Sequence, residues 1–300
     1  MLRITIDVFS GRPNPSYELT DAEARDLLQD VARRRDTITG VAEGFDGLGF
    51  RGVIVESLTD ALADEFGGDL PAKFKVGGGA AADEANGLDI AERLVRGLAD
   101  HEPAPDSTPV GASLMQYLVD LLREPPGAAT GRDARGPGES EPSPRDDTCG
   151  IESDKFDPDF WNAADVITKN NCYNYASDWR TDTFAQPGLG AGEVWQSLSC
   201  QDVTRAALAD GCHRQFDCFP DSEKPRRLVA LVMAPDIDYH WYRIHTHEEG
   251  FWGHKPGGTA ARNVDNSNRL ITNPETCDRG MYTQFCGYFY TCLSQRNRIK

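Results

Sequence analysis

The stretch RLVALVMAPDIDYHWYRIHT, residues 227–246, decides the fold of the second half of the chain. Its first part, 227–234, is a continuous apolar run of strand length, which is typical of a buried strand. Its second part, 239–246, is rich in aromatic residues and predicts another strand. A turn at Glu249-Gly250 then leads into a third strand over 251–255. The order predicts an antiparallel meander.

Two helices are predicted before this meander. The first begins near Asn170 and runs to about Trp179, and the second covers 201–209 and ends at Asp210-Gly211. Glycine commonly ends a helix because it adopts the left-handed conformation without strain. Helices followed by an antiparallel meander indicate an α+β fold.

The first 123 residues predict a separate small α/β module. Leu2–Phe9 alternates apolar and polar residues as a strand does, and the turn sequence SGRPNP follows it. Thr20 and Glu23 have the spacing of a capping box, which indicates a helix start. A further strand at 50–56, a Gly- and Ala-rich loop at 75–85 and amphipathic helices at 88–98 and 114–122 complete the prediction. We expect a recognition or regulatory role for residues 1–123.

Residues 124–148 predict a linker, because they contain five prolines and four glycines and few apolar residues. The Cys-rich second domain then covers 149–300. All eight cysteines lie in it, from Cys149 to Cys292. This density suggests disulfides and an oxidising compartment, so a secreted or cell-surface location is suspected, although the N-terminus does not resemble a signal peptide.

The net charge of −17, the lengths of the apolar runs and the glycine pattern together exclude several classes of function. Nucleic-acid binding requires clustered Lys and Arg, so no nucleic-acid partner is expected. No apolar run approaches the roughly 20 residues that span a bilayer, so no membrane span is expected. No cofactor is indicated either, since the Gly-x-Gly-x-Gly run at 188–192 lacks the context of a dinucleotide fold.

The segment NNCYNYA, residues 170–176, is a candidate nucleophile site. With Asn170 as N-cap, Cys172 would lie in the first helical turn, where the helix dipole favours a thiolate. The alternative is that Cys172 belongs to one of four disulfides, because the number of cysteines is even.

His240 is the candidate base for this thiol. Strand alternation places it on one face with Tyr242 and Ile244, while Tyr239, Trp241, Arg243 and His245 take the other face. Asp265 or Asn266 would orient the imidazole, although both are also typical turn residues. His254 is a rival base, and Gln186 a candidate oxyanion-hole amide.

A metal site is a weaker interpretation of the same region. Four histidines cluster within 15 residues, with three acidic residues nearby: His240, His245, His247 and His254, with Glu248, Glu249 and Asp265. Zinc accepts such ligands, but no His-Glu-x-x-His spacing is present, and alternation separates His240 from His245. We therefore expect no metal. For the remaining cysteines, disulfides are favoured over zinc because paired Cys-x-x-Cys spacing is missing.

The order Cys172, His240, then Asp265 or Asn266 resembles papain-like cysteine hydrolases of the CHAP and NlpC types, over roughly residues 156–290. The segments FSGRPNP, NNCYNYA, TFAQPG, HWYR and HKPG also resemble a set of uncharacterised bacterial proteins. The resemblance implies Cys172 as nucleophile, His240 as base and Asp265, or Asn266 in its place, as the third residue. It implies a papain-like second domain.

The function expected from these residues is that of a cysteine-dependent amide hydrolase or transamidase, such as a peptidase or peptidoglycan amidase. Its substrate would be a peptide, protein or cell-wall amide. Two alternatives remain open. One is a non-catalytic, disulfide-stabilised binding module, with Trp241, Tyr242, Phe251 and Trp252 as its ligand surface. The other is a secreted effector or toxin.

Overall fold

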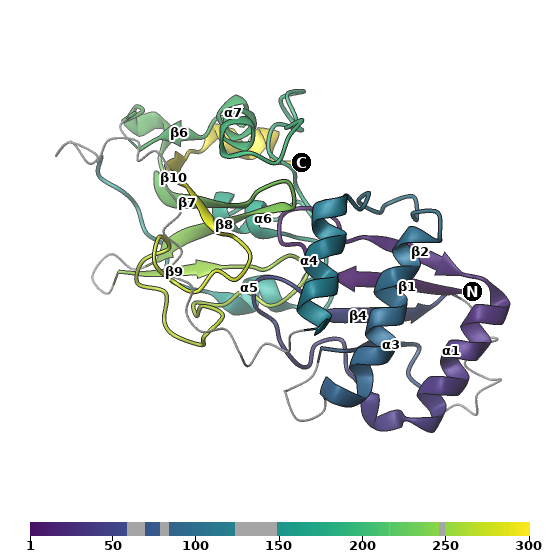
Figure 1. Cartoon of the computed structure of the whole chain (residues 1–300). Coiled ribbons are helices and arrows are strands. Elements are labelled where there is room, and N and C mark those ends of the chain that lie inside the picture. Colours follow the sequence, from purple (N-terminus) through teal and green to yellow (C-terminus); the bar gives the residue numbers. More distant parts are fainter. Residues whose placement is uncertain (59–69, 79–83, 124–148, 216, 246–249) are drawn as a thin grey trace. The chain divides into compact units, whose positions relative to one another are not determined.

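The computed structural model describes residues 1–58, 70–78, 84–123, 149–215, 217–245 and 250–300. The predicted linker and the histidine and acidic residues at 247–249 lie outside these ranges. The chain forms two compact units, coloured by sequence position in Figure 1. The first unit holds residues 1–9 and 13–132, and the second holds 133–300 together with Ser10–Arg12. The chain is therefore α+β, as predicted, with helices and antiparallel sheets in both units.

The first unit contains a five-stranded sheet with the order β2-β1-β4-β5-β3. Its strands are β1 (Leu2–Asp7), β2 (Ser16–Leu19), β3 (Ile38–Thr39), β4 (Gly52–Ser57) and β5 (Lys73–Val76). Every described pairing is antiparallel. β1 matches the predicted first strand because Leu2, Ile4 and Ile6 alternate toward the core and are fully or almost fully buried.

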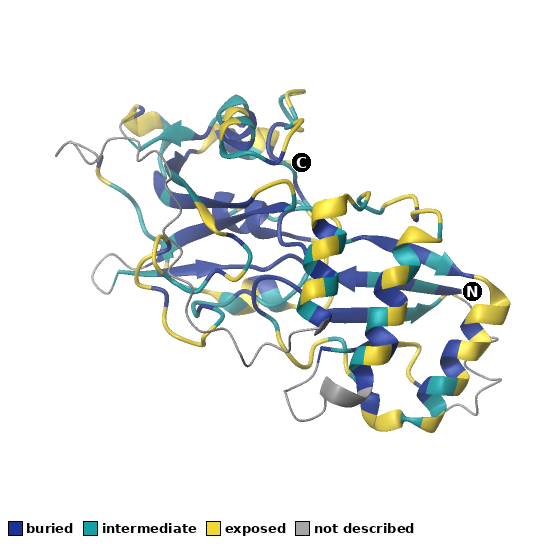
Figure 2. Cartoon of the chain, in the orientation of Figure 1, coloured by how far each residue is buried: buried dark blue, intermediate teal, exposed yellow. Residues whose placement is uncertain are grey.

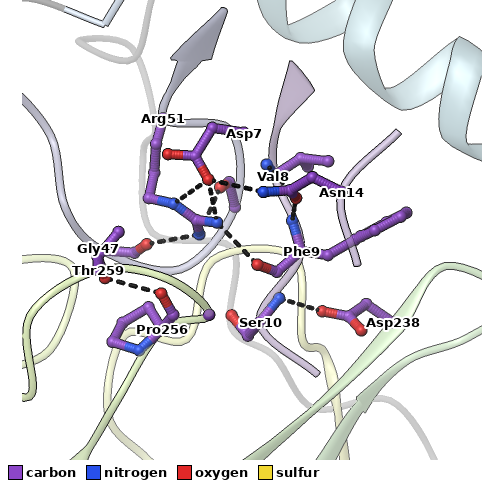
Figure 3. Close-up of polar contacts among 12 residues, drawn as sticks. Asp7, Val8, Phe9, Ser10, Asn14, Gly47, Arg51, Asp238, Pro256 and Thr259 are labelled. Carbon is purple, nitrogen blue, oxygen red and sulfur yellow. Dashed lines mark hydrogen bonds and ion pairs between the residues drawn. The ribbon is translucent and has the colours of Figure 1, made fainter. Parts of the chain in front are cut away.

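Within the described residues, the α-helices of this unit are α1 (Asp21–Arg33), α3 (Glu84–Arg96) and α4 (Ala112–Arg123). The 3-10 turns η1 (Arg35–Thr37) and η2 (Gly97–Ala99) follow α1 and α3. The capping box at Thr20 and Glu23 is confirmed, since each side chain accepts a hydrogen bond from the other's backbone N–H. α3 and α4 lie across one face of the sheet (Figure 1). In the same unit, the buried Arg51 guanidinium donates to Asp7 and to the Phe9 carbonyl (Figure 3).

The second unit also has a five-stranded antiparallel sheet, with the order β6-β10-β7-β8-β9. Its strands are β6 (His213–Arg214), β7 (Arg227–Ala234), β8 (Asp238–His245), β9 (Phe251–His254) and β10 (Gln284–Thr291). The meander predicted from 227–255 is confirmed as β7, β8 and β9. Figure 2 shows β7 and β8 in the buried colour, which agrees with their burial along almost their whole length.

The helices of the second unit are α5 (Pro158–Asn162), α6 (Cys172–Ser177) and α7 (Cys200–Asp210), with 3-10 turns η3 (Asp221–Glu223) and η4 (Ser294–Arg298). α6 packs against β8, and α7 packs against β7 and β10. The N-cap of α6 is Asn171, whereas the sequence predicted Asn170. Cys172 nevertheless opens the helix.

Two disulfides stabilise the second unit: Cys149–Cys218 and Cys200–Cys286. The other four cysteines are free thiols: Cys172, Cys212, Cys277 and Cys292. The alternative in which Cys172 is disulfide-bonded is therefore wrong in this structure. Among the helices in the described ranges, none combines the length and apolar character needed to cross a bilayer.

Candidate functional site

The N-terminus of α6 is built by an asparagine pair. The Asn171 side-chain oxygen accepts from the backbone N–H groups of Tyr173 and Asn174, each at 3.1 Å. The Asn174 oxygen accepts in return from the Asn171 N–H at 3.1 Å. These bonds satisfy donors that the first turn of a helix otherwise leaves unpaired. The cap therefore fixes the position of Cys172.

The Cys172 thiol is sealed inside the core. Its side chain is 0% exposed and packs in one apolar cluster with Tyr239 and Trp241. Burial, followed by the negative charge of Asp238, raises the pKa of the thiol well above its ordinary value. A thiolate is disfavoured in such surroundings, because burial outweighs the backbone N–H groups of Trp241 and Cys172, which lower the pKa.

β8 carries its side chains on two faces that meet different neighbours. Tyr239 and Trp241 pack with Cys172, and Arg243 lies over the ring of Tyr175 from α6. His240 instead packs against the rings of Tyr242, His254 and Tyr282. The alternation predicted for this strand thus holds, and it directs His240 away from the face on which α6 packs. The contacts described for Cys172 and for His240 are therefore with different neighbours.

His240 and His254 form a buried hydrogen-bonded pair. The His240 Nε2 lies 2.9 Å from the His254 Nδ1, and the His254 Nε2 lies 3.0 Å from the carbonyl oxygen of Val264. A carbonyl only accepts, so the proton of neutral His254 is on Nε2, and His240 donates to its Nδ1. Burial lowers the pKa of His254 to about 3. His254 is therefore neutral at physiological pH.

His245 is the imidazole on the α6 face of β8. Its Nε2 lies 2.6 Å from the Tyr175 hydroxyl, and its Nδ1 lies 3.0 Å from the carbonyl oxygen of Asp154. By the same reasoning Nδ1 donates and Nε2 accepts. Burial, together with the Arg243 charge, lowers the pKa of His245 to about 4. Both nitrogens are committed to structural hydrogen bonds.

Asp265 organises a loop. Its carboxylate accepts from the backbone N–H groups of Ser267, Arg269 and Asp278, each at 3.0 Å, and pairs with the Arg269 guanidinium. Burial raises the pKa of this carboxyl, but these donors outweigh it, so the pKa lies below its ordinary value. Asn266 is held in the same loop by its N–H bond to the Asp278 carbonyl. These contacts favour a role for Asp265 and Asn266 as turn residues over a role in orienting an imidazole.

The predicted oxyanion-hole amide has another partner. The Gln186 Nε2 donates to the Gly11 carbonyl at 2.8 Å, and the Asn171 Nδ2 donates to the same oxygen at 2.8 Å. The Tyr239 hydroxyl lies 2.9 Å from it and shares its proton with the Gln186 oxygen at 3.1 Å. Three donors therefore surround a single carbonyl.

Asp238 holds the other side of the same tripeptide. One carboxylate oxygen accepts from the N–H of Ser10 at 2.6 Å, the N–H of Gly11 at 3.2 Å and the Tyr282 hydroxyl at 2.6 Å. Figure 3 shows the Ser10 N–H directed at Asp238. Burial raises the pKa of this carboxyl despite these bonds. We call the five side chains around residues 10–12 the Gly11 cradle: Asn171, Gln186, Asp238, Tyr239 and Tyr282.

The cradle is a feature that sequence reasoning missed. SGRPNP was interpreted only as a turn that ends the first strand. Its contacts join residues separated by 160 to 228 positions, which no local pattern reveals. One signal was present, because four of the five cradle residues lie in or beside the motif segments around 171, 186 and 239.

A metal centre is not supported by the geometry. Within the described ranges, no group of three His, Cys, Asp or Glu side chains is arranged to hold an ion. His240 and His245 point to opposite faces of β8 and have different partners.

The structure thus defines a class: a disulfide-bonded α+β protein whose candidate thiol, imidazole and carboxylate each have their own set of contacts. No family model and no solved structure matches the chain. Over 138 residues it is 41% identical to insoluble matrix shell protein 1 of Ruditapes philippinarum. The match covers 45% of this chain and 88% of that protein. The chain belongs to the same family as insoluble matrix shell protein 1.

This relationship corrects the expected activity. The hydrolase prediction, with its cysteine peptidase and amidase variants, is wrong, because the related protein is a shell matrix protein. The structure agrees with this correction, because Cys172 is buried in the core and His240 packs against other side chains.

Proposed function

We propose that the chain is a secreted, non-catalytic, disulfide-stabilised protein that is built into an insoluble extracellular matrix. The observation that carries the proposal is the relationship to insoluble matrix shell protein 1, of which the chain covers 88% at 41% identity. The proposal develops the alternative of a disulfide-stabilised binding module and replaces the hydrolase prediction.

The disulfides support a location outside the reducing cytosol. Cys149–Cys218 and Cys200–Cys286 close loops of 69 and 86 residues. Loops of this length are worth about 4 kcal/mol each in the chain-entropy description. Disulfides persist in oxidising compartments, so both bonds favour a secreted protein.

Binding in this proposal depends on charge and not on the aromatic surface expected above. Trp241 and Tyr242 are 0% exposed and Trp252 is 5% exposed, so their rings are occupied in the core. The net charge of −17 instead favours positively charged matrix components, whose attraction weakens as salt is added.

The test is secretion of the full chain followed by sequential extraction of the extracellular material. We expect most of the protein to stay with the insoluble fraction in low-salt buffer and its retained share to fall as salt is added, and quantitative immunoblotting measures this share. The matched variants are Cys172→Ala, which should be retained like the wild type, and Cys149→Ser/Cys218→Ser, which should be retained less. Complete release of the wild type in low-salt buffer, or amide hydrolysis that Cys172→Ala abolishes, would refute the proposal.

A further inference from the structure

The Gly11 cradle surrounds a peptide segment from a distant part of the sequence. Ser10–Arg12 belongs to the second unit, whereas the residues directly before and after it, Phe9 and Pro13, belong to the first. Such an arrangement is that of a peptide held in a recognition site, in which main-chain groups of the peptide make the bonds.

The site is selective in three ways. The backbone N–H groups of Ser10 and Gly11 donate to the Asp238 carboxylate. The Gly11 carbonyl accepts from the two side-chain amides and the tyrosine hydroxyl described above. A Cβ at position 11 would lie 2.4 Å from the Tyr239 ring, so the central residue must be glycine. The Arg12 guanidinium donates to the Ile237 carbonyl at 2.9 Å and lies over the Trp195 ring.

We propose that the Gly11 cradle is a binding site for a Ser-Gly-Arg segment, and that a second copy of this chain supplies that segment when copies are concentrated. Exchange of residues 10–12 between copies would link them through contacts identical to those within one chain.

The energetics allow this exchange. The same contacts hold the segment in either arrangement, so the two arrangements differ mainly in the effective concentration of the segment that belongs to the same chain. Residues 124–148, with five prolines and four glycines, lie between the segment and the cradle in sequence.

The test mixes two full-length variants. Gly11→Val cannot seat its own segment because of the Tyr239 ring, but it keeps an intact cradle. Asp238→Ala keeps the segment but loses the acceptor of both N–H groups. We expect each variant alone to be monomeric and the mixture to form a heterodimer, with a doubled mass in analytical ultracentrifugation. Absence of the heterodimer from a mixture of two folded variants would overturn the proposal.

A peptide keeps the test decisive if a variant folds poorly. The peptide VFSGRPN, residues 8–14, should bind Gly11→Val and raise its melting temperature, or rescue its refolding. It should bind neither Asp238→Ala nor the wild type, whose cradle is filled. The control variant is Gly150→Ala, since a Cβ at position 150 meets no atom within 4 Å. If the peptide neither binds nor rescues Gly11→Val, residues 10–12 are only a fixed part of the fold. The inference uses the proposed matrix role for its setting alone: exchange is measured in solution, and retention is measured separately.

Discussion

The two faces of β8 show how the thiol of α6 and an imidazole of the strand can each pack against β8 and still have different neighbours. The face toward α6 carries Trp241 beside the Cys172 thiol and His245 beside Tyr175. The other face carries His240, paired with His254. Chemistry-bearing residue types in a familiar order therefore do not make a site unless their side chains share a face. The period of two along a strand decides this.

The largest expected effect comes from Trp241→Ala on the α6 face. Removing a fully buried indole costs about 3–5 kcal/mol, and the cavity opens beside Cys172. We expect a lower denaturation midpoint and rapid alkylation of Cys172, read by peptide mass spectrometry.

Tyr242→Ala is the matched change on the other face. Tyr242 is also fully buried, so a similar loss of stability is expected, but Cys172 should stay protected in the folded state. Equal alkylation of Cys172 in both folded variants would contradict the separation of the two faces.

A second prediction concerns acid, because each face buries a neutral histidine. The pKa of His245 is lowered to about 4 and that of His254 to about 3, against an ordinary 6.5 in the unfolded chain. As the pH falls below 6.5, these histidines bind protons in the unfolded state but not in the folded state. The free energy of unfolding therefore decreases. Linkage gives about 2 kcal/mol per histidine between pH 8 and pH 5.

The measurement is the free energy of unfolding from urea titrations across this pH range. His245→Gln should reduce the pH dependence of the free energy of unfolding by the contribution of one histidine. His254→Gln should reduce it by a similar amount. Unchanged slopes in both variants would mean that these imidazoles are protonated in the folded protein.

The strands that decide the fold of the second unit were predictable from sequence. Residues 227–234 form β7 with the predicted bounds, because a run buried on both faces has a clear pattern. β10 was missed, since Gly287 interrupts its pattern with a bulge at a positive φ of 131°. β5 lies partly inside a predicted loop, because four residues are too few to show a period.

The candidate site was less predictable than the fold. Strand alternation correctly separated His240 from Trp241, but the face on which α6 packs is set by long-range contacts that no spacing encodes. Cys172 at a helix start was expected to be a thiolate. Its burial reverses the effect of the helix, because desolvation of a fully buried thiol exceeds what one short helix can offer.

The smallest expected effect, and the one that sharpens the comparison most, is that of Cys172→Ala. The change removes one sulfur atom from an apolar cluster that Tyr239 and Trp241 otherwise keep closed. A loss of about 1 kcal/mol is expected, because small truncations in a core cost little more than the transfer of the lost atom. Iodoacetamide labelling of the native wild type should leave Cys172 unmodified and react first with Cys277, the free thiol that is only half-buried. Preferential labelling of Cys172 would show that the core opens at this helix, and the thiol would then have to be considered reactive.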